Sequence, residues 1–184
     1  MKILSADLER VRLRPFGVDD APSLYALYSD PETMRYLVRP RMTDPSQAEE
    51  MLAKALAAYE DGSNLQLAIE RRSDRAFLGA CLLFRFDAPS RRAEIGYILG
   101  QAHWGQGYLS EALPALIDHG FGELKLNRLE ADVDPRNEAS MRVLDRMGFR
   151  REGLLRERCV VNGQPADSAV FGLLKREWVG RDPV

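Results

Sequence analysis

Ten residues, Trp104-Gly105-Gln106-Gly107-Tyr108-Leu109-Ser110-Glu111-Ala112-Leu113, join a strand-like run to a helix-like run through two glycines spaced Gly-x-Gly. Because glycine has no Cβ, it reaches backbone angles closed to other residues and lets an anion approach the main chain. The helix that follows presents unpaired N–H groups and the positive end of its dipole to that anion. This stretch therefore predicts an anion-binding turn suited to phosphate.

Two familiar phosphate loops do not match this turn. The dinucleotide fingerprint needs a third glycine, and Ser110 stands in its place. The P-loop needs Gly-Lys-Ser/Thr, and no lysine follows these glycines. Since Gly-x-Gly before a helix is also an ordinary tight connection, the turn alone does not identify a ligand.

Composition limits the classes of protein to consider. The 184 residues, 45% of them apolar, suffice for a single domain over residues 1–184, with a core from about residue 8 to 178. The 26 basic and 28 acidic residues give a net charge of −2, so no global field attracts nucleic acid or a membrane surface. Cys81 and Cys159 lie in separate apolar runs and are expected to be buried thiols. With only His103 and His119 beside them, no zinc pattern forms and no metal is expected.

Nothing in the sequence resembles a targeting or membrane segment. The first seven residues hold too short an apolar stretch for a signal peptide, and no later run approaches a membrane span. We therefore expect a cytoplasmic protein, as a monomer or a homodimer, without nucleic acid or membrane as partners.

Hydrophobic periodicity predicts the secondary structure. The predicted strands are residues 8–14, 64–70, 77–86, 93–99, 127–133, 149–161 and 166–174. One predicted helix begins at Asp19 or Asp20 and ends at Tyr28, and a short one begins at Asp30-Pro31. Three further helices are predicted at residues 45–60, 108–121 and 137–147. Pro114 is expected to bend the helix that contains it.

This order predicts an α+β fold, with a mixed, mostly antiparallel sheet of about seven strands and helices on both faces. The strand before Gly105 and the strand at 127–133 are joined by a helix, so they are expected to be parallel neighbours. A ligand at the turn would then lie beside the ends of these two strands.

Two further segments complete a family pattern, Ala93-Glu94-Ile95-Gly96-Tyr97-Ile98-Leu99 and Asn137 to Phe149. With Glu-Ile-Gly-Tyr, Trp-Gly-x-Gly-Tyr, Asn-x-x-Ser and Gly-Phe in order, the chain resembles the GCN5-related N-acetyltransferase (GNAT) superfamily, and within it the RimJ/RimL type of ribosomal-protein alanine acetyltransferase. The likeness runs from Val11-Arg12-Leu13-Arg14-Pro15 almost to Trp178. It implies an acyltransferase that moves acetyl directly from acetyl-CoA to an amine.

The resemblance also implies where acetyl-CoA lies. Its pyrophosphate would bind the main chain of the turn, and its pantetheine arm would run along the preceding strand like an added strand. The implied contacts are Ile98, Leu99, Trp104, Gly105, Gln106, Gly107, Tyr108, Leu109, Ser110, Asn137 and Arg146. A main-chain N–H of that strand would polarise the thioester carbonyl. Ordinary structural roles remain as alternatives, core packing for Ile98 and Leu99 and a helix N-cap for Asn137.

Two residues are candidates for the chemistry. The superfamily's tyrosine acid, four residues before Gly-Phe, is replaced by Leu144, and the RimJ/RimL resemblance implies that Ser140 hydrogen-bonds the leaving sulfur instead. Glu94 is the candidate base, because the attacking amine must be neutral, and an α-amine with a pKa near ~8 loses its proton more readily than a lysine near ~10.4. The structural alternatives are a packing role for Ser140 and a surface ion pair of Glu94 with Arg91 or Arg92.

The sequence thus predicts an acetyl-CoA-dependent N-acetyltransferase acting on a primary amine, such as a protein N-terminal α-amino group. The alternatives are a small-molecule amine acetyltransferase, a non-catalytic CoA-binding module of the same fold, and a nucleotide-binding regulator. The last lacks a complete nucleotide fingerprint. Acceptor contacts are expected from the helices between Asp19 and Glu60 and from the hairpin around Asn162-Gly163.

Overall fold

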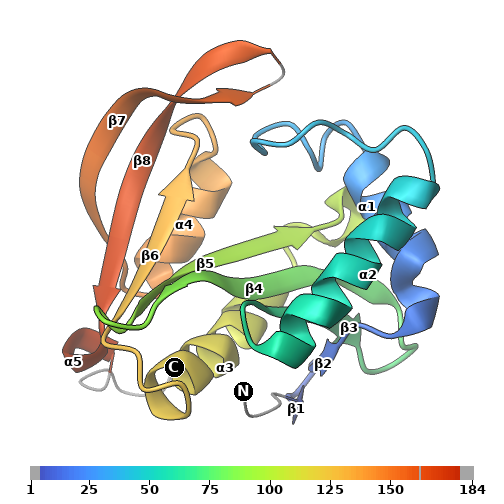
Figure 1. The fold of residues 1–184 in the computed structure, drawn as a ribbon, viewed down its shortest axis with the longest axis horizontal. Coiled ribbons are helices and arrows are strands. Elements are labelled where there is room, and N and C mark those ends of the chain that lie inside the picture. The colour runs from blue at the N-terminus through green and yellow to red at the C-terminus, as the bar shows by residue number, and fades with distance from the viewer. Residues whose placement is uncertain (1–4, 162, 179–184) are drawn as a thin grey trace.

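The computed structural model describes residues 5–161 and 163–178 of the chain. Its strands form one 8-stranded sheet in the order β1-β2-β3-β4-β5-β6-β8-β7, with helices on both faces (Figure 1). The predicted mixed, mostly antiparallel α+β fold is confirmed, with one strand more than the approximate number expected. Two parts of the sequence predictions lie outside the described residues. They are Asn162 of the predicted hairpin turn and residues 1–4, the start of the segment considered as a signal peptide.

The strands are β1 (Ala6–Asp7), β2 (Val11–Pro15), β3 (Leu65–Arg71), β4 (Phe77–Asp87), β5 (Arg92–Leu99), β6 (Arg128–Val133), β7 (Arg150–Val161) and β8 (Gln164–Leu174). The α-helices are α1 (Ala21–Ser29), α2 (Ser46–Asp61), α3 (Tyr108–Gly122), α4 (Glu138–Arg146) and α5 (Lys175–Trp178). Two 3-10 turns, η1 (Val18–Asp20) and η2 (Gln101–His103), precede α1 and the Gly-x-Gly turn.

The N-terminal region departs from the predicted pattern. The strand predicted at 8–14 begins only at Val11, because the Leu8 amide donates to the Val11 carbonyl (2.9 Å) and turns the chain between β1 and β2. The short helix predicted from Asp30-Pro31 is wrong, since residues 31–36 form successive turns. There the Asp30 carboxylate accepts a hydrogen bond from the Thr33 amide (2.7 Å). This side-chain bond forms a local turn in place of the main-chain hydrogen bonds of a helix.

Most of the remaining helix signals are confirmed. Gly62 ends α2 in the left-handed conformation (φ 77°), and Gly148 (φ 82°) follows α4 in the same way. Pro114 lies inside α3, which continues through it to Gly122.

The sheet separates two hydrophobic cores. On one face, buried residues of α3 such as Leu113 and Leu116 pack with Ile95 of β5. On the other face, α1 and α2 pack with Ile98 of the same strand. Since side chains alternate along a strand, Ile95 and Tyr97 belong to the α3 face, whereas Glu94, Gly96 and Ile98 belong to the α1–α2 face, as predicted.

The strands β5 and β6 pair in parallel over a short stretch only. The register joins residues 92–94 to residues 128–130, ending at Glu94 and Glu130, although β5 continues to Leu99 and β6 to Val133. Because β6 stays paired with β8, it diverges from β5 (Figure 1). The prediction of parallel neighbours is confirmed. Beyond Glu94, no strand of residues 5–161 and 163–178 pairs with β5 on its β6 side.

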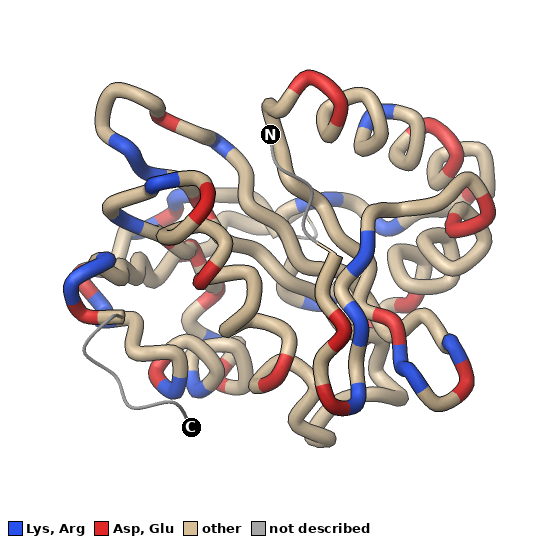
Figure 2. Tube along the Cα trace, turned by 90° about the horizontal axis from the view of Figure 1, so that it is seen from below, with Lys and Arg blue, Asp and Glu red and all other residues tan. Residues whose placement is uncertain are grey.

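Charged positions of both signs are spread along the described chain, with basic and acidic positions interspersed (Figure 2). Among the helices of the described residues, none combines the length and the apolar run needed to span a membrane.

Candidate functional site

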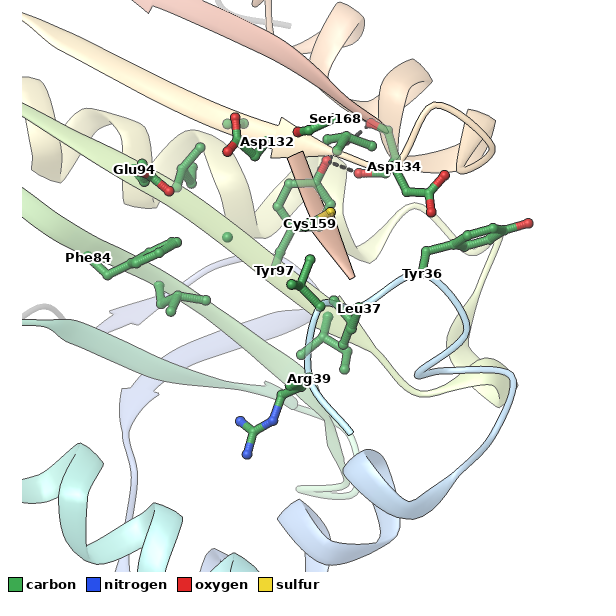
Figure 3. A pocket seen from close by; sticks show the side chains of 18 of the residues that line it. Tyr36, Leu37, Arg39, Phe84, Glu94, Tyr97, Asp132, Asp134, Cys159 and Ser168 are labelled. Carbon is green, nitrogen blue, oxygen red and sulfur yellow. Dashed lines mark hydrogen bonds between the residues drawn. The ribbon is translucent and has the colours of Figure 1, made fainter. Parts of the chain in front are cut away.

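A cavity of about 730 Å³ opens where β5 and β6 separate (Figure 3). Its lining comes from the α1–α2 connection, from β4, β5 and β6, from the start of α4 and from the β7–β8 hairpin. Glu94 and Ser140, the two candidates for chemistry, both line it, together with Ile98 and Asn137. The opening thus connects the α1–α2 face, which carries Glu94, with the helix that carries Ser140.

Two hydroxyl groups meet at this opening. The Tyr97 Oη lies 2.9 Å from the Ser140 Oγ and 3.1 Å from the Ser140 carbonyl oxygen. Burial raises the pKa of Tyr97 to about 12, with the Ser140 bond opposing, so the phenol stays protonated at neutral pH. Sequence reasoning assigned Tyr97 no role, although it ends the Glu-Ile-Gly-Tyr motif, because alternation places its side chain on the face opposite Glu94.

Asn137 holds the first turn of α4. Its Oδ1 accepts from the Ser140 amide (3.1 Å), which is an N-cap geometry. The cap fixes Ser140 one turn into the helix and uses the side-chain oxygen, so that the Nδ2 group remains available to a ligand.

Glu94 forms an ion pair inside the cavity. Both of its carboxylate oxygens lie close to the Arg85 Nη1, at 3.1 and 3.0 Å, and the Glu94 side chain is 17% exposed. A bulge in β4 between Phe84 and Asp87 places Arg85 at φ 51°. In a regular strand Arg85 would point to the face opposite Phe84, and the bulge re-aims it.

The ion pair considered from the sequence, between Glu94 and Arg91 or Arg92, does not form. Arg92 instead pairs with Glu130 (2.6 Å) on β6 and with Asp87 (3.2 Å). Glu94 is therefore held by a residue that local sequence spacing did not suggest.

The Gly-x-Gly turn has the geometry of an anion site. Gly105 (φ 71°) and Gly107 (φ 79°) both occupy the left-handed region, and Gly107 caps α3 without any side-chain bond. Within the described chain, the amides of residues 105–109 donate no hydrogen bond. A Cβ on Gly105 would meet nothing within 4 Å, so the space before these amides is open. The turn therefore has unpaired main-chain donors that suit a phosphate group.

Two side chains of the turn fix its shape. The Trp104 indole N–H donates to the Leu99 carbonyl (2.8 Å), which ties the turn to the end of β5. The Gln106 Nε2 donates to the Ala102 carbonyl (2.8 Å) of η2. Both residues contribute to the site by positioning its main chain.

Sequence reasoning missed the anchor of α3. The Glu111 carboxylate accepts from the amides of Arg10 (2.5 Å) and Val11 (3.0 Å), and the Arg10 guanidinium bonds both Glu111 (3.0 Å) and the Gln106 carbonyl (2.9 Å). Burial raises the pKa of Glu111, but these bonds outweigh it and hold the pKa below its usual value. Since 101 residues separate Arg10 from Glu111, no local pattern reveals the contact.

The other residues predicted to contact acetyl-CoA differ in how far they are buried. The carbonyl of Ile98 lies against Gly79 of β4, so by strand alternation the main chain of Tyr97 and Leu99 faces the opening. Around the turn, Tyr108 is buried, Leu109 is half-buried and exposed Ser110 donates its amide to the Gly107 carbonyl (3.0 Å). Arg146 is exposed at the C-terminal end of α4 and does not line the cavity.

The β6 side of the cavity is acidic. Asp134 is buried and pairs with Arg136 (2.6 Å), whereas Asp132 is exposed. Burial, followed by the charges of Asp134 and Asp132, raises the pKa of the Cys159 thiol on β7. The β6 side of the opening therefore carries carboxylates that the sequence analysis did not identify.

Comparison with known proteins agrees with this geometry. Residues 10–150 match the acetyltransferase (GNAT) domain. An uncharacterized N-acetyltransferase of Bacillus licheniformis, p20, is 40% identical over 172 residues, which cover 94% of this chain and 97% of the relative. The spermidine N(1)-acetyltransferase of Escherichia coli is 27% identical over 170 residues, 92% of this chain and 88% of that protein. The crystal structure of a GNAT-family acetyltransferase from Bacillus anthracis superposes with a TM-score of 0.84 at 25% identity, covering 95% of this chain and 100% of that one.

Proposed function

The chain belongs to the GNAT acetyltransferase family, and on that premise we propose that this N-acetyltransferase acts on the α-amino group of a protein N-terminus. The charge of the cavity carries the proposal. Three carboxylates line it. Glu94 and Asp134 are paired with arginines, whereas Asp132 has no ion pair with any described residue. A single ammonium group matches this arrangement.

The arginines of the cavity disfavour a polyamine acceptor. Arg39, Arg85 and Arg158 line the same walls, and only Arg85 is neutralised by a carboxylate of the lining. A tri- or tetracation would bring its further charges towards these guanidinium groups, and like charges close together are destabilising. The tail of an N-terminal peptide carries carbonyl oxygens, which accept hydrogen bonds from arginine.

The donor would bind along the opening and the turn. We assign the CoA pyrophosphate to the amides of residues 105–109, and the pantetheine arm to the main chain of Tyr97 and Leu99 as an added strand. A main-chain N–H of this strand would stabilise the negative charge that develops on the thioester oxygen. Asn137 would offer its Nδ2 group to the same arm.

Three side chains would act on the reacting groups. Ser140 hydrogen-bonds the sulfur as it leaves, and Tyr97, 2.9 Å away and protonated, supports that hydroxyl. Glu94, held by Arg85, orients the acceptor on the α1–α2 side of the opening.

The acceptor class is tested with a panel of amines and acetyl-CoA. Tetrapeptides beginning with alanine or serine should release CoA thiol with at least about tenfold higher kcat/KM than spermidine or an N-terminally blocked lysine peptide. A preference for spermidine would overturn the proposal. Stabilisation by acetyl-CoA without thiol release from any amine would favour the non-catalytic CoA-binding module.

Ser140→Ala is expected to lower kcat by about 10- to 100-fold and to leave the Kd for CoA within about twofold. The hydroxyl meets full charge only when the thiolate forms, so its loss affects the transition state more than the bound ground state. Thiol release at saturating substrates gives kcat, and titration calorimetry gives the Kd. Exposed Ser63→Ala is the matched control, and a wild-type kcat in Ser140→Ala would remove Ser140 from the mechanism.

A further inference from the structure

The two strands that border the opening carry carboxylates on the same face. Glu94 and Glu130 form the last pair of the β5–β6 ladder, and alternation places Gly96 and Asp132, two residues further along, on that same face. Beyond the last pair the strands separate, so Asp132 stands across the opening from a residue without a side chain. Figure 3 shows Asp132 on β6 and Glu94 on β5 as two of the residues lining the cavity.

Asp132 differs from the neighbouring acids in its partners. The neighbouring acids are paired: Glu94 with Arg85, Glu130 with Arg92 and Arg128, and Asp134 with Arg136. Asp132 has no ion pair or hydrogen bond from any side chain in the described chain, and its exposed carboxylate faces the cavity. A carboxylate in this state can accept a hydrogen bond from an incoming amine without giving up an existing partner.

Charged and titratable groups from several elements line the cavity together with Asp132. They are Tyr28 of α1, Tyr36 and Arg39 of the α1–α2 connection, Arg85 of β4, Glu94 and Tyr97 of β5, Asp134 directly after β6, and Arg158 and Cys159 of β7. Glu130 lies two residues before Asp132 on the same face of β6. The arginine pairs offset the other carboxylates, whereas no ion pair in the described chain offsets the charge of Asp132. That charge contributes to the raised pKa of Cys159.

Glu94, the base expected from the sequence, already has a charged partner. Its two oxygens lie at 3.1 and 3.0 Å from the Arg85 Nη1, so an incoming amine would share this carboxylate with the guanidinium. The β4 bulge holds Arg85 at φ 51°, a conformation that costs free energy in any residue other than glycine. The backbone of β4 therefore holds Arg85 in position to pair with Glu94.

We infer that Asp132 is the catalytic residue that accepts the proton of the acceptor amine. The inference rests on the proposed function, because the amine must attack the thioester directly. The Asp132 carboxylate first takes one proton from the acceptor ammonium, and the freed nitrogen lone pair forms the N–C bond as the carbonyl π pair moves to oxygen. The nitrogen then loses its second proton to water. The oxygen pair then re-forms C=O, the C–S bond breaks, and the thiolate takes a proton through Ser140. Amide and free CoA leave, Asp132 releases its proton to water, and Ser140 regains one from water.

Asp132→Asn tests this role through the pH dependence of turnover. With an alanine-initiated tetrapeptide, kcat/KM should fall about 100-fold at pH ~7, at the lower end of the range of general-base removal. The loss should shrink to less than about fivefold at pH ~9.5, because solvent then deprotonates the amine, whose pKa is near ~8. The Kd for CoA should stay within about twofold of the wild-type value.

Two further variants separate proton transfer from a structural effect. Glu94→Gln is expected to lower kcat/KM by a factor that does not change with pH, and exposed Asp61→Asn at the end of α2 should match the wild type. A wild-type pH profile in Asp132→Asn, or a loss of constant size from pH ~7 to ~9.5, would overturn the inference and leave the proposed function intact. Turnover of spermidine but not of peptides would overturn the proposed acceptor, and the same variants would then be compared on spermidine.

Discussion

Gly107→Val is expected to weaken CoA binding by about a thousandfold, equivalent to about 4 kcal/mol. At φ 79° a branched residue is strained by about 1–3 kcal/mol. A Cβ on Gly107 would lie 3.4 Å from the Arg10 Nη2, so the larger valine side chain would press on the guanidinium that holds the Gln106 carbonyl and would shift the turn. Each charge-assisted hydrogen bond lost to a phosphate costs about 1.5–3 kcal/mol. Titration calorimetry with CoA measures the change directly.

Gly163→Val separates strain from ligand contact. Gly163 has φ 78°, in the turn between β7 and β8, and a Cβ there would meet nothing within 4 Å. The substitution imposes similar backbone strain away from the Gly-x-Gly turn. We expect comparable drops in melting temperature for the two variants, but a CoA affinity within about twofold of wild type for Gly163→Val only. Wild-type CoA affinity in Gly107→Val would mean that the turn does not hold the pyrophosphate.

The parts of the site predicted from sequence are those encoded by short segments. The Gly-x-Gly turn, the start of α3 and the Asn137 cap each depend on residues a few positions apart, where backbone angles and caps follow local chemistry. The parallel pairing of β5 and β6 was also predicted, because a helical crossover leaves few alternatives.

The parts that the sequence did not reveal depend on distant contacts or on local irregularity. Glu111 meets Arg10 across 101 residues, which no spacing rule reports. Arg85 reaches Glu94 only because a bulge reverses its direction, and simple alternation places it on the wrong face. Asp132 lines the opening because the β5–β6 pairing ends at Glu94 and Glu130. Periodicity predicts where strands lie, but it does not show where two paired strands separate.

Arg14→Met is expected to destabilise the fold by about 3–5 kcal/mol, a large share of the ~5–15 kcal/mol typical of a domain. Arg14 joins β2 to η1 and β3 through Asp20 (2.7 and 2.9 Å) and Glu70 (2.7 Å). These carboxylates are only 7% and 5% exposed. Removal of the guanidinium leaves two buried charges with weaker partners, the Gly17 amide for Asp20 (2.8 Å) and the exposed Arg75 for Glu70 (4.0 Å). Methionine keeps much of the side-chain length, which limits the contribution of lost packing.

The free energy of unfolding, from urea denaturation at neutral pH, gives the size of this effect. Arg12→Met on the same strand is the control, because Arg12 pairs with Asp7 (3.4 Å) where both side chains are largely exposed, at 41% and 63%. Such surface pairs contribute less than about 1 kcal/mol. A similar loss in both variants would mean that the Arg14 network adds nothing beyond a surface ion pair.

The pH dependence of the Arg14→Met effect follows from Asp20. Burial raises the pKa of Asp20, but the bonds from Arg14 and the Gly17 amide outweigh it and hold the pKa below its usual value. A depressed folded-state pKa contributes stability above the unfolded pKa of ~3.9, and this stability is lost as pH falls through the folded value. Without Arg14, burial dominates, the folded pKa of Asp20 rises above ~3.9, and protonation on acidification relieves the buried charge. The difference in unfolding free energy between wild type and Arg14→Met should therefore shrink from pH ~7 towards pH ~4, and a constant difference would contradict this electrostatic origin.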